Sequence, residues 1–342
     1  MTDKNAKKQL PGALRFLIKL FKIILYIPIQ IIFIPFAIIG LIDAIYKEMV
    51  NCKKLGVSFT AVQALQYRWI MHYFNTRPDP LSVAFIKKLP CESHFGLWST
   101  LGALIISQRL FGFTTKLGKL DEPGEETLYS CPGRRVLMFD RIMEKYVDEM
   151  EQIVIPGGGF DLIALQLTKG KKVKVFELDQ EKTLNVKVET LKKAGIKHDW
   201  ITYIPVDYSN ESWVDKLLGA GFDKTKKTLF LWESVSLYLE ADIVKETLRE
   251  MADLCVDGCI IAQDFYSKAF ILGETSKIVK RSMGMMAKMG EPWKFGIDMS
   301  NDPKAAVESF LKECGLKTTE YTQFSEKIDI EPFYCIVEAE KL

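Results

Sequence analysis

The order of apolar and polar positions divides the chain into three parts. An apolar run without a charge extends from Ile23 to Ile42, a helical pattern broken by turn signals follows over 55–133, and short apolar runs alternate with amphipathic segments from 134 onward. This pattern predicts a membrane-associating segment within 1–54, a helical region that covers a substrate over 55–133, and an α/β domain over 134–342.

The third part predicts a Rossmann-like sheet. Five apolar runs are expected to be strands: Glu151–Pro156, Lys172–Leu178, Trp200–Val206, Thr228–Trp232 and Gly258–Phe265. Helical patterns, among them Ala241–Leu254, separate these runs, which favours a parallel sheet with helices on both faces. Ligands bind such sheets at the carboxyl ends of the strands. Two last strands are expected near Lys317–Tyr321 and Tyr334–Glu338.

The apolar run Ile23 to Ile42 is about 20 residues long, the length that crosses a hydrocarbon layer of ~30 Å. Pro28 and Pro35 can kink a helix within it. Three alternatives stay open: a segment in one leaflet, a true span, and a helix buried in the protein. The first is favoured, because it keeps the catalytic domain on the cytoplasmic side with basic residues on both flanks near anionic headgroups.

Composition narrows the classes of partner. The 342 residues carry 46 basic and 44 acidic side chains, a net charge of +2, so nucleic acid is disfavoured as a partner. Seven scattered cysteines indicate reduced thiols in a large chain. Cys255 and Cys259 lack a second Cys/His pair at ligand spacing, and we expect no metal site.

A glycine turn follows the first expected strand. Gly157, Gly158 and Gly159 permit a tight turn and let a ligand approach bare backbone, and Asp161 comes shortly after them. The third glycine of the dinucleotide fingerprint is missing, since Leu162 occupies its position. This argues against a nicotinamide-dependent oxidoreductase, which we keep as an alternative.

Acidic residues end the next strands. Glu177 and Asp179 lie about 20 residues after the glycines, where a carboxylate can accept hydrogen bonds from ribose hydroxyls. Asp207 ends the third expected strand, where it could receive the amine of an adenine, and Glu233 ends the fourth. The pattern therefore predicts a nucleoside-containing cofactor.

Together these motifs resemble the leucine carboxyl methyltransferase-like family of class I S-adenosylmethionine-dependent methyltransferases. The most specific segments are Arg135…Phe139-Asp140, Gly157–Asp161, Phe176–Asp179, Pro205–Asp207 and Glu233…Tyr238-Leu239. The resemblance implies the cofactor S-adenosyl-L-methionine, with Gly157 and Gly159 against it and Glu177 on its ribose. It also implies that Asp207 lies near the adenine, Arg135 near the methionine carboxylate, and Glu233 near the sulfonium and the acceptor.

The chain also departs from this family. Leu162 and Ile163 stand where the family usually has Thr-Arg, which leaves open a non-catalytic membrane adaptor that retains the fold. As an enzyme, the chain is expected to methylate a carboxyl or hydroxyl group on a small apolar or lipid-like acceptor. A hydroxyl acceptor would benefit from a base, for which Glu233, Tyr266 and Asp264 are candidates.

Overall fold

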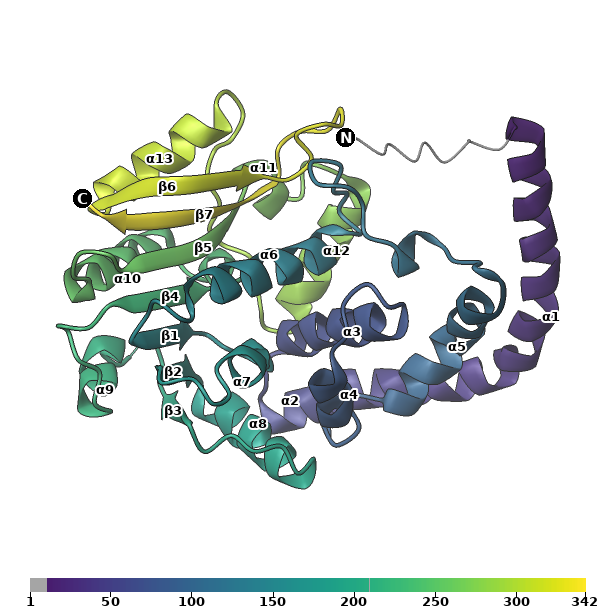
Figure 1. Ribbon diagram of the computed structural model, residues 1–342, viewed down its shortest axis with the longest axis horizontal. Helices are drawn as coiled ribbons and strands as arrows, with labels where there is room; N and C mark the ends of the chain where they lie inside the picture. The colour runs from purple at the N-terminus through teal and green to yellow at the C-terminus, as the bar shows by residue number, and fades with distance from the viewer. Residues whose placement is uncertain (1–10, 209) are drawn as a thin grey trace, which may run out of the picture.

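A seven-stranded sheet forms the centre of the computed structural model, which describes residues 11–208 and 210–342 (Figure 1). The first ten residues of the expected anchor and Ser209 lie outside this range. The strand order is β3-β2-β1-β4-β5-β7-β6. The strands are β1 (Gln152–Pro156), β2 (Lys174–Asp179), β3 (Ile201–Pro205), β4 (Thr228–Trp232), β5 (Ile260–Tyr266), β6 (Leu316–Gln323) and β7 (Tyr334–Lys341).

The sheet is mainly parallel. Strands β1 to β5 run in one direction, and β7 lies antiparallel between β5 and β6. All residues of β1, β4 and β5 are buried because helices cover both faces. The strand order reverses between β1 and β4, so the switch point lies at their carboxyl ends, the place where open α/β sheets bind ligands. The predicted Rossmann-like sheet is confirmed.

Two layers of helices cover the sheet. Helices α6, α7 and α8 contribute to the hydrophobic core on one face, and α9, α10 and α13 contribute to the core on the other. The helices are α6 (Cys131–Tyr146), α7 (Ile163–Leu167), α8 (Glu181–Lys193), α9 (Trp213–Gly219), α10 (Ala241–Leu254), α11 (Lys268–Ile271), α12 (Lys277–Lys288) and α13 (Pro303–Glu313), with the 3-10 turn η3 (Ser236–Tyr238).

The N-terminal part is helical. Helix α1 (Gly12–Ile45) continues through a π-helical segment, η1 (Tyr46–Asn51), into α2 (Cys52–Leu55), and it curves along one end of the molecule beside α5 (Figure 1). It is followed by α3 (Phe59–Tyr73), α4 (Pro80–Ile86), α5 (His94–Phe111) and the short turn η2 (Lys116–Gly118). Asp79 caps α4, because its carboxylate accepts the N–H of Ser82 at 2.9 Å.

The helical region and the sheet share one hydrophobic core. Trp69 of α3 and Phe85 of α4 belong to the same buried cluster as Ile153 and Ile155 of β1. The boundary expected at residue 134 lies inside α6, which begins at Cys131. The core therefore continues from the helical region into the sheet without interruption.

A buried ion network joins the helical region to the α/β part. Arg77 donates from Nη2 to Asp140 of α6 at 3.0 Å and to Gln166 of α7 at 2.8 Å, and it forms a further ion pair with Asp79. Arg68 of α3 lies 3.8 Å from Asp140. Side chains of Arg68, Arg77, Asp79 and Asp140 are almost entirely removed from solvent. Each charge is thus stabilised only by its partners.

We expect Arg77→Met to lower the free energy of unfolding by about 3–5 kcal/mol, because it leaves buried carboxylates without their cation. Urea unfolding at neutral pH measures the loss. The matched control is Lys171→Met, which removes a cation from the exposed pair with Asp148 and should cost less than about 1 kcal/mol. Equal stability of the two variants would contradict the role of the network.

Candidate active site

The glycine turn lies at the carboxyl end of β1. Gly157 and Gly159 have positive φ angles of +71° and +48°, a conformation that favours glycine. A Cβ atom on Gly157 would lie 2.4 Å from a methyl group of Val235, and one on Gly158 would lie 2.6 Å from Cγ of Glu177. Val235 and Glu177 thus pack closely against the turn, and the turn itself consists of backbone without side chains at the switch point.

Asp179 stands at the rim of this turn. Its carboxylate accepts the N–H of Gly159 and the N–H of Gln180, both at 2.7 Å. Burial raises the pKa of Asp179, and these two backbone hydrogen bonds oppose the rise. The side chain is half-buried at the end of β2, so it combines a fixed orientation with access for a ligand.

Glu177 has a different environment, two residues earlier on β2. It is only 2% exposed, and its carboxylate forms an ion pair with Lys187, which is fully buried. Lys187 also donates to the carbonyl oxygen of Asp161 at 2.5 Å. Burial raises the pKa of Glu177 to about 7 against the opposing effect of Lys187. These contacts favour a structural role for Glu177 beneath the turn and favour Asp179 as the acid that meets a ribose.

Asp161 connects the turn to the helical region. One carboxylate oxygen accepts the N–H of Ile163 at 2.6 Å, and the other forms an ion pair with Arg68. Burial alone would raise the pKa of Asp161, but Arg68 and the backbone hydrogen bond lower it overall. Asp161 is therefore a charged link between the turn and α3.

Three of the predicted residues meet at the ends of β4 and β5. Arg135 of α6 donates from Nε to Glu233 at 2.8 Å and from Nη1 to the hydroxyl oxygen of Tyr266 at 3.1 Å. Burial raises the pKa of Glu233 to about 7, although Arg135 acts in the opposite direction. The Glu233 side chain keeps 19% of its surface exposed. A carboxyl group that titrates near neutral pH thus lies beside a fixed guanidinium.

Asp264, the third candidate base, is held by other groups. Its carboxylate accepts the N–H of Ser234 at 2.7 Å, the Ser234 hydroxyl at 3.0 Å and the Tyr334 hydroxyl at 2.7 Å. Asp264 is fully buried, and Ser234 has a φ of +54°, a conformation with a cost for a residue other than glycine. Asp264 therefore fixes the strained backbone next to Glu233 and is not available as a base.

Asp207 lies in the loop after β3, on the same edge of the sheet. It is exposed, its backbone N–H donates to Glu211 at 2.9 Å, and its carboxylate accepts a hydrogen bond from Asn210 at 2.7 Å. Because β2 and β3 are parallel neighbours, Asp207 and Asp179 end adjacent strands. This is the relative position expected for acids that contact the two ends of a nucleoside.

Helix α3 covers the glycine turn. A Cβ atom on Gly159 would lie 3.2 Å from the Cβ atom of Ala61. The first turn of α3 is held by Glu291, whose carboxylate accepts the N–H of Phe59 at 2.7 Å, the N–H of Thr60 at 3.1 Å and the Thr60 hydroxyl at 2.7 Å. Glu291, in the loop after α12, thus holds α3 in its position over the glycine turn.

Sequence reasoning gave no role to Arg68, Lys187 or Glu291. A signal existed for Lys187, because it lies in the apolar stripe of α8 between Leu184 and Leu191, where a lysine needs a buried partner. Arg68 stands between Tyr67 and Trp69 in an apolar helix, which is a weaker signal of the same kind. Glu291 acts on residues more than 230 positions earlier, so no local pattern shows its contact.

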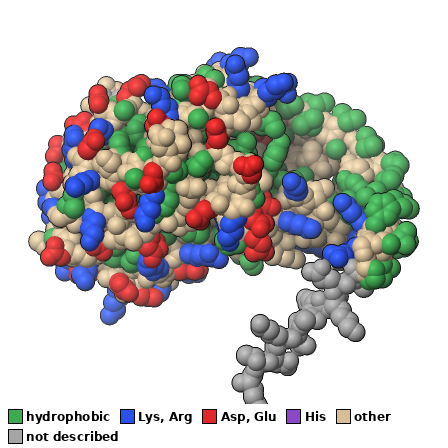
Figure 2. Space-filling model, turned by 90° about the horizontal axis from the view of Figure 1, so that it is seen from above, with side chains coloured by type: hydrophobic (Ala, Val, Ile, Leu, Met, Phe, Trp, Pro, Cys, Tyr) green, Lys and Arg blue, Asp and Glu red, His purple; other side chains and the backbone are tan. Residues whose placement is uncertain are grey.

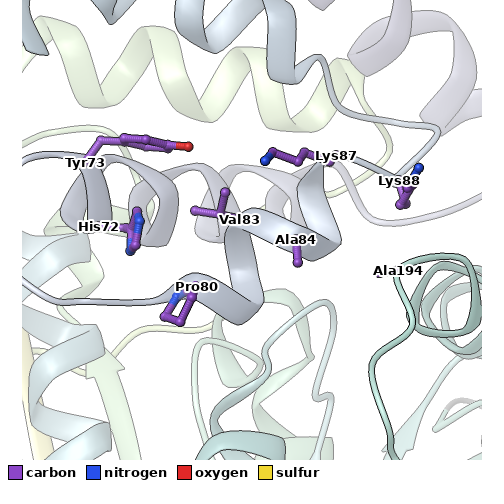
Figure 3. A pocket seen from close by; sticks show the side chains of 8 residues that line it. All are labelled: His72, Tyr73, Pro80, Val83, Ala84, Lys87, Lys88 and Ala194. Carbon is purple, nitrogen blue, oxygen red and sulfur yellow. The ribbon is translucent and has the colours of Figure 1, made fainter. Parts of the chain in front are cut away.

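A separate groove lies between the α3–α4 region and the end of α8 (Figure 3). Its volume is about 450 Å³, and none of the side chains that line it belongs to the predicted site. The lining residues are His72, Tyr73, Pro80, Val83, Ala84, Lys87, Lys88 and Ala194. The strand-end cluster, and not this groove, contains the predicted chemistry.

The chain has relatives among known proteins. Residues 101–252 match the family model of leucine carboxyl methyltransferase. A protein of Mycobacteroides abscessus, whose name assigns it to the S-adenosyl-L-methionine-dependent methyltransferases, is 27% identical over 188 residues, which cover 54% of this chain and 60% of that protein. A protein of Mycobacterium ulcerans with the same name is 32% identical over 119 residues, or 34% and 38% of the two chains.

The chain spans about three fifths of the length of the first of these relatives. Solved structures with some likeness include mitomycin 7-O-methyltransferase, with a TM-score of 0.42 and 12% identity over 63% of this chain and 56% of that chain. Another is magnesium protoporphyrin IX methyltransferase from Synechocystis PCC 6803, with a TM-score of 0.41 and 12% identity over 65% and 90%. The domain match and the sequence relatives support the expected resemblance to the leucine carboxyl methyltransferase-like family of S-adenosylmethionine-dependent methyltransferases.

Proposed function

We propose that the protein is an S-adenosylmethionine-dependent methyltransferase that methylates a carboxyl or hydroxyl group of a small apolar acceptor. The observation that carries this proposal is the convergence of the Gly157–Gly159 turn, Asp179 and the Arg135–Glu233 pair at the carboxyl ends of β1, β2 and β4. The match of residues 101–252 to the family model supports the same chemistry.

The residues present fit this cofactor. The turn would offer backbone atoms to a nucleoside, because Gly157 and Gly158 carry no side chain, and Val235 and Glu177 fill the space that a Cβ atom would take. Asp179 would accept hydrogen bonds from the ribose hydroxyls, Asp207 would receive the adenine amine, and Arg135 would bind the methionine carboxylate. When bound, the cofactor supplies an electrophilic methyl group on a sulfonium.

The chain's own contribution is to position the acceptor and to control its protonation. Holding two reactants in line can supply about 7–11 kcal/mol of the barrier reduction. Glu233, with a pKa of about 7, can take the proton of a hydroxyl acceptor near neutral pH. A carboxylate acceptor is already deprotonated and needs from Glu233 and Arg135 only orientation and exclusion of water.

The proposed setting is a membrane, with the catalytic domain on the cytoplasmic side where its cofactor is found. The support for this setting is α1, whose side chains between Ile24 and Ile45 are largely apolar and exposed. An acceptor delivered from a bilayer would be apolar or lipid-like, with its carboxyl or hydroxyl group near the headgroups.

We expect titration calorimetry to detect S-adenosylmethionine binding to the detergent-solubilised full chain. Asp179→Asn should weaken the affinity by about tenfold or more, because it removes a charge-assisted hydrogen bond. The amide can accept only one of the two backbone N–H groups that Asp179 holds, so we also expect a loss of about 1–3 kcal/mol in the free energy of unfolding. The control Glu189→Gln alters an exposed carboxylate on α8 and should bind normally. Binding of a nicotinamide dinucleotide would support an oxidoreductase, and binding of neither ligand would support a non-catalytic adaptor.

Glu177→Ala, unlike Asp179→Asn, should mainly lower the stability of the fold. Because it leaves the fully buried Lys187 without its carboxylate partner, we expect it to lower the free energy of unfolding by about 3–5 kcal/mol. Urea unfolding measures this loss. If the Glu177→Ala protein is as stable as the wild type but has lost its affinity for the cofactor, Glu177 and not Asp179 binds the ribose.

The raised pKa of Glu233 predicts a pH dependence. A carboxyl whose pKa is higher in the folded protein stabilises the fold fully below its ordinary pKa near 4.5, and this contribution is lost as the pH rises to about 7. We expect the stability of the wild type relative to Glu233→Gln to fall across this window and to level off above it, as measured by urea unfolding at fixed ionic strength. A constant difference between the two proteins would contradict the assignment.

A further inference from the structure

Helix α1 has two distinct faces. Its partly or fully buried positions recur about every three or four residues: Lys22, Ile23, Tyr26, Ile29, Gln30, Phe33, Ala37, Gly40, Asp43 and Ala44. The positions between them are exposed and apolar. This period is that of one helix stripe, so α1 has an inner face against the protein and an outer face without a partner in the described chain.

Small residues bring the inner face close to α5. A Cβ atom on Gly40 would lie 1.8 Å from the Ser99 hydroxyl oxygen, and one on Gly102 would lie 2.5 Å from the Phe33 ring. A hydrogen bond joins α1 to the α5 region at each end of this contact. Lys22 donates to the carbonyl oxygen of Gly112 at 3.1 Å, and Ser93 donates to Asp43. From Lys22 to Asp43, α1 thus lies antiparallel along the whole of α5.

The other side of α5 belongs to the body of the protein. Leu104 and Ile105 are buried in the main hydrophobic core, and Gln108 donates to the carbonyl oxygen of Phe74 at 3.1 Å. The rings of Trp98 and Trp69 are 5.8 Å apart. Both ends of α5 therefore contact α3, which shares its hydrophobic core with the sheet. If residues 23–42 crossed a bilayer while attached to α5, the charged globular part would have to enter the hydrocarbon with them.

The outer face of α1 has the composition of a surface that contacts lipid. Hydrophobic side chains gather at the end of the molecule where α1 lies (Figure 2). Twelve of them between Ile24 and Ile45 are 38–65% exposed: Ile24, Leu25, Ile27, Ile31, Ile32, Ile34, Phe36, Ile38, Ile39, Leu41, Ile42 and Ile45. Exposed apolar patches of this kind indicate an interaction site.

The charges at the two ends of this apolar stretch are mainly positive. Arg15 and Lys19 precede it and are exposed, and Lys53 and Lys54 follow it in α2, also exposed. Basic residues that flank an apolar helix face complement the anionic headgroups of a bilayer, each contributing about 1 kcal/mol near the surface. This charge pattern distinguishes a lipid surface from a second copy of the same helix, whose basic ends would add further positive charge.

We infer that α1 lies within one leaflet of an anionic bilayer, parallel to the membrane plane, and that its contact with α5 attaches it to the rest of the protein. The polypeptide before Ile23 and the catalytic part after Ile42 are then on the same side of the membrane. This one-sided attachment is independent of the acceptor and of the proposed chemistry. It resolves the three alternatives for residues 23–42 in favour of the one that needs no crossing.

The sidedness is tested with the double variant Ala13→Cys/Lys54→Cys, whose new thiols lie at exposed positions on the two sides of the apolar stretch. The protein is reconstituted into phosphatidylcholine–phosphatidylglycerol vesicles and treated with a membrane-impermeant maleimide, and the labels per molecule are counted by intact mass. In-plane attachment gives molecules with two labels or none. A span gives one label per molecule and overturns the inference. The parent chain, whose seven cysteines are buried, is the control.

The outer face is tested with Ile32→Glu/Ile39→Glu in flotation with the same vesicles. Because both side chains point outward, with 65% and 60% of their surface exposed, we expect partition to fall by more than about tenfold. Ile330→Glu/Leu342→Glu, an equal change of charge at exposed positions away from α1, should float like the wild type. Omission of phosphatidylglycerol should also weaken binding.

Two results would overturn the docking surface. One is wild-type protein that stays soluble without detergent and does not float with the vesicles. The other is a dimer that hides α1 and is broken by Ile32→Glu/Ile39→Glu, which would make a second copy the occupant. Cofactor titration of each variant in detergent separates these outcomes from the proposed activity, since partition and cofactor affinity are measured independently.

Discussion

The constraint on which the structure depends is the burial of two arginines that each need a carboxylate. Arg68 and Arg77 come from the helical region, whereas Asp140 and Asp161 come from the α/β part. Burial makes any mismatch of these charges costly, so α3 and α4 can adopt only one position against α6 and α7. Because Asp161 directly follows the glycine turn, the same charges fix the turn that would receive the cofactor.

The periodic parts of this fold follow from the sequence. The expected strand Thr228–Trp232 and the expected helix Ala241–Leu254 coincide with β4 and α10, because both are bounded by clear changes in the apolar pattern. The positions of the glycine turn and of the acids after β2 and β3 also follow, since each is a local feature at the end of a strand. Helix α7 is only one short segment, Ile163–Leu167, because the turn after β1 continues to Leu162 before the helix starts.

The division of roles among the acids could not be predicted in this way. Glu177 and Asp179 are two residues apart on one strand and look equivalent in the sequence. Lys187 makes the difference, because it forms an ion pair with Glu177 from α8, whereas the hydrogen bonds described for Asp179 come from two backbone N–H groups. Likewise, the sequence does not show that the carboxylate of Asp264 accepts hydrogen bonds from the hydroxyl groups of Tyr334 and Ser234. Contacts between distant parts of the chain decide which carboxylates remain available.

The pairing of α1 with α5 has a consequence for how the protein is made. Helix α1 is synthesised before α5, and the small residues that receive its inner face, such as Gly96 and Gly102, follow only after α2, α3 and α4. During that interval the inner face of this apolar helix lacks the helix on which it packs. Truncations that end before α5 therefore leave the apolar helix α1 without the helix on which its inner face packs in the full chain.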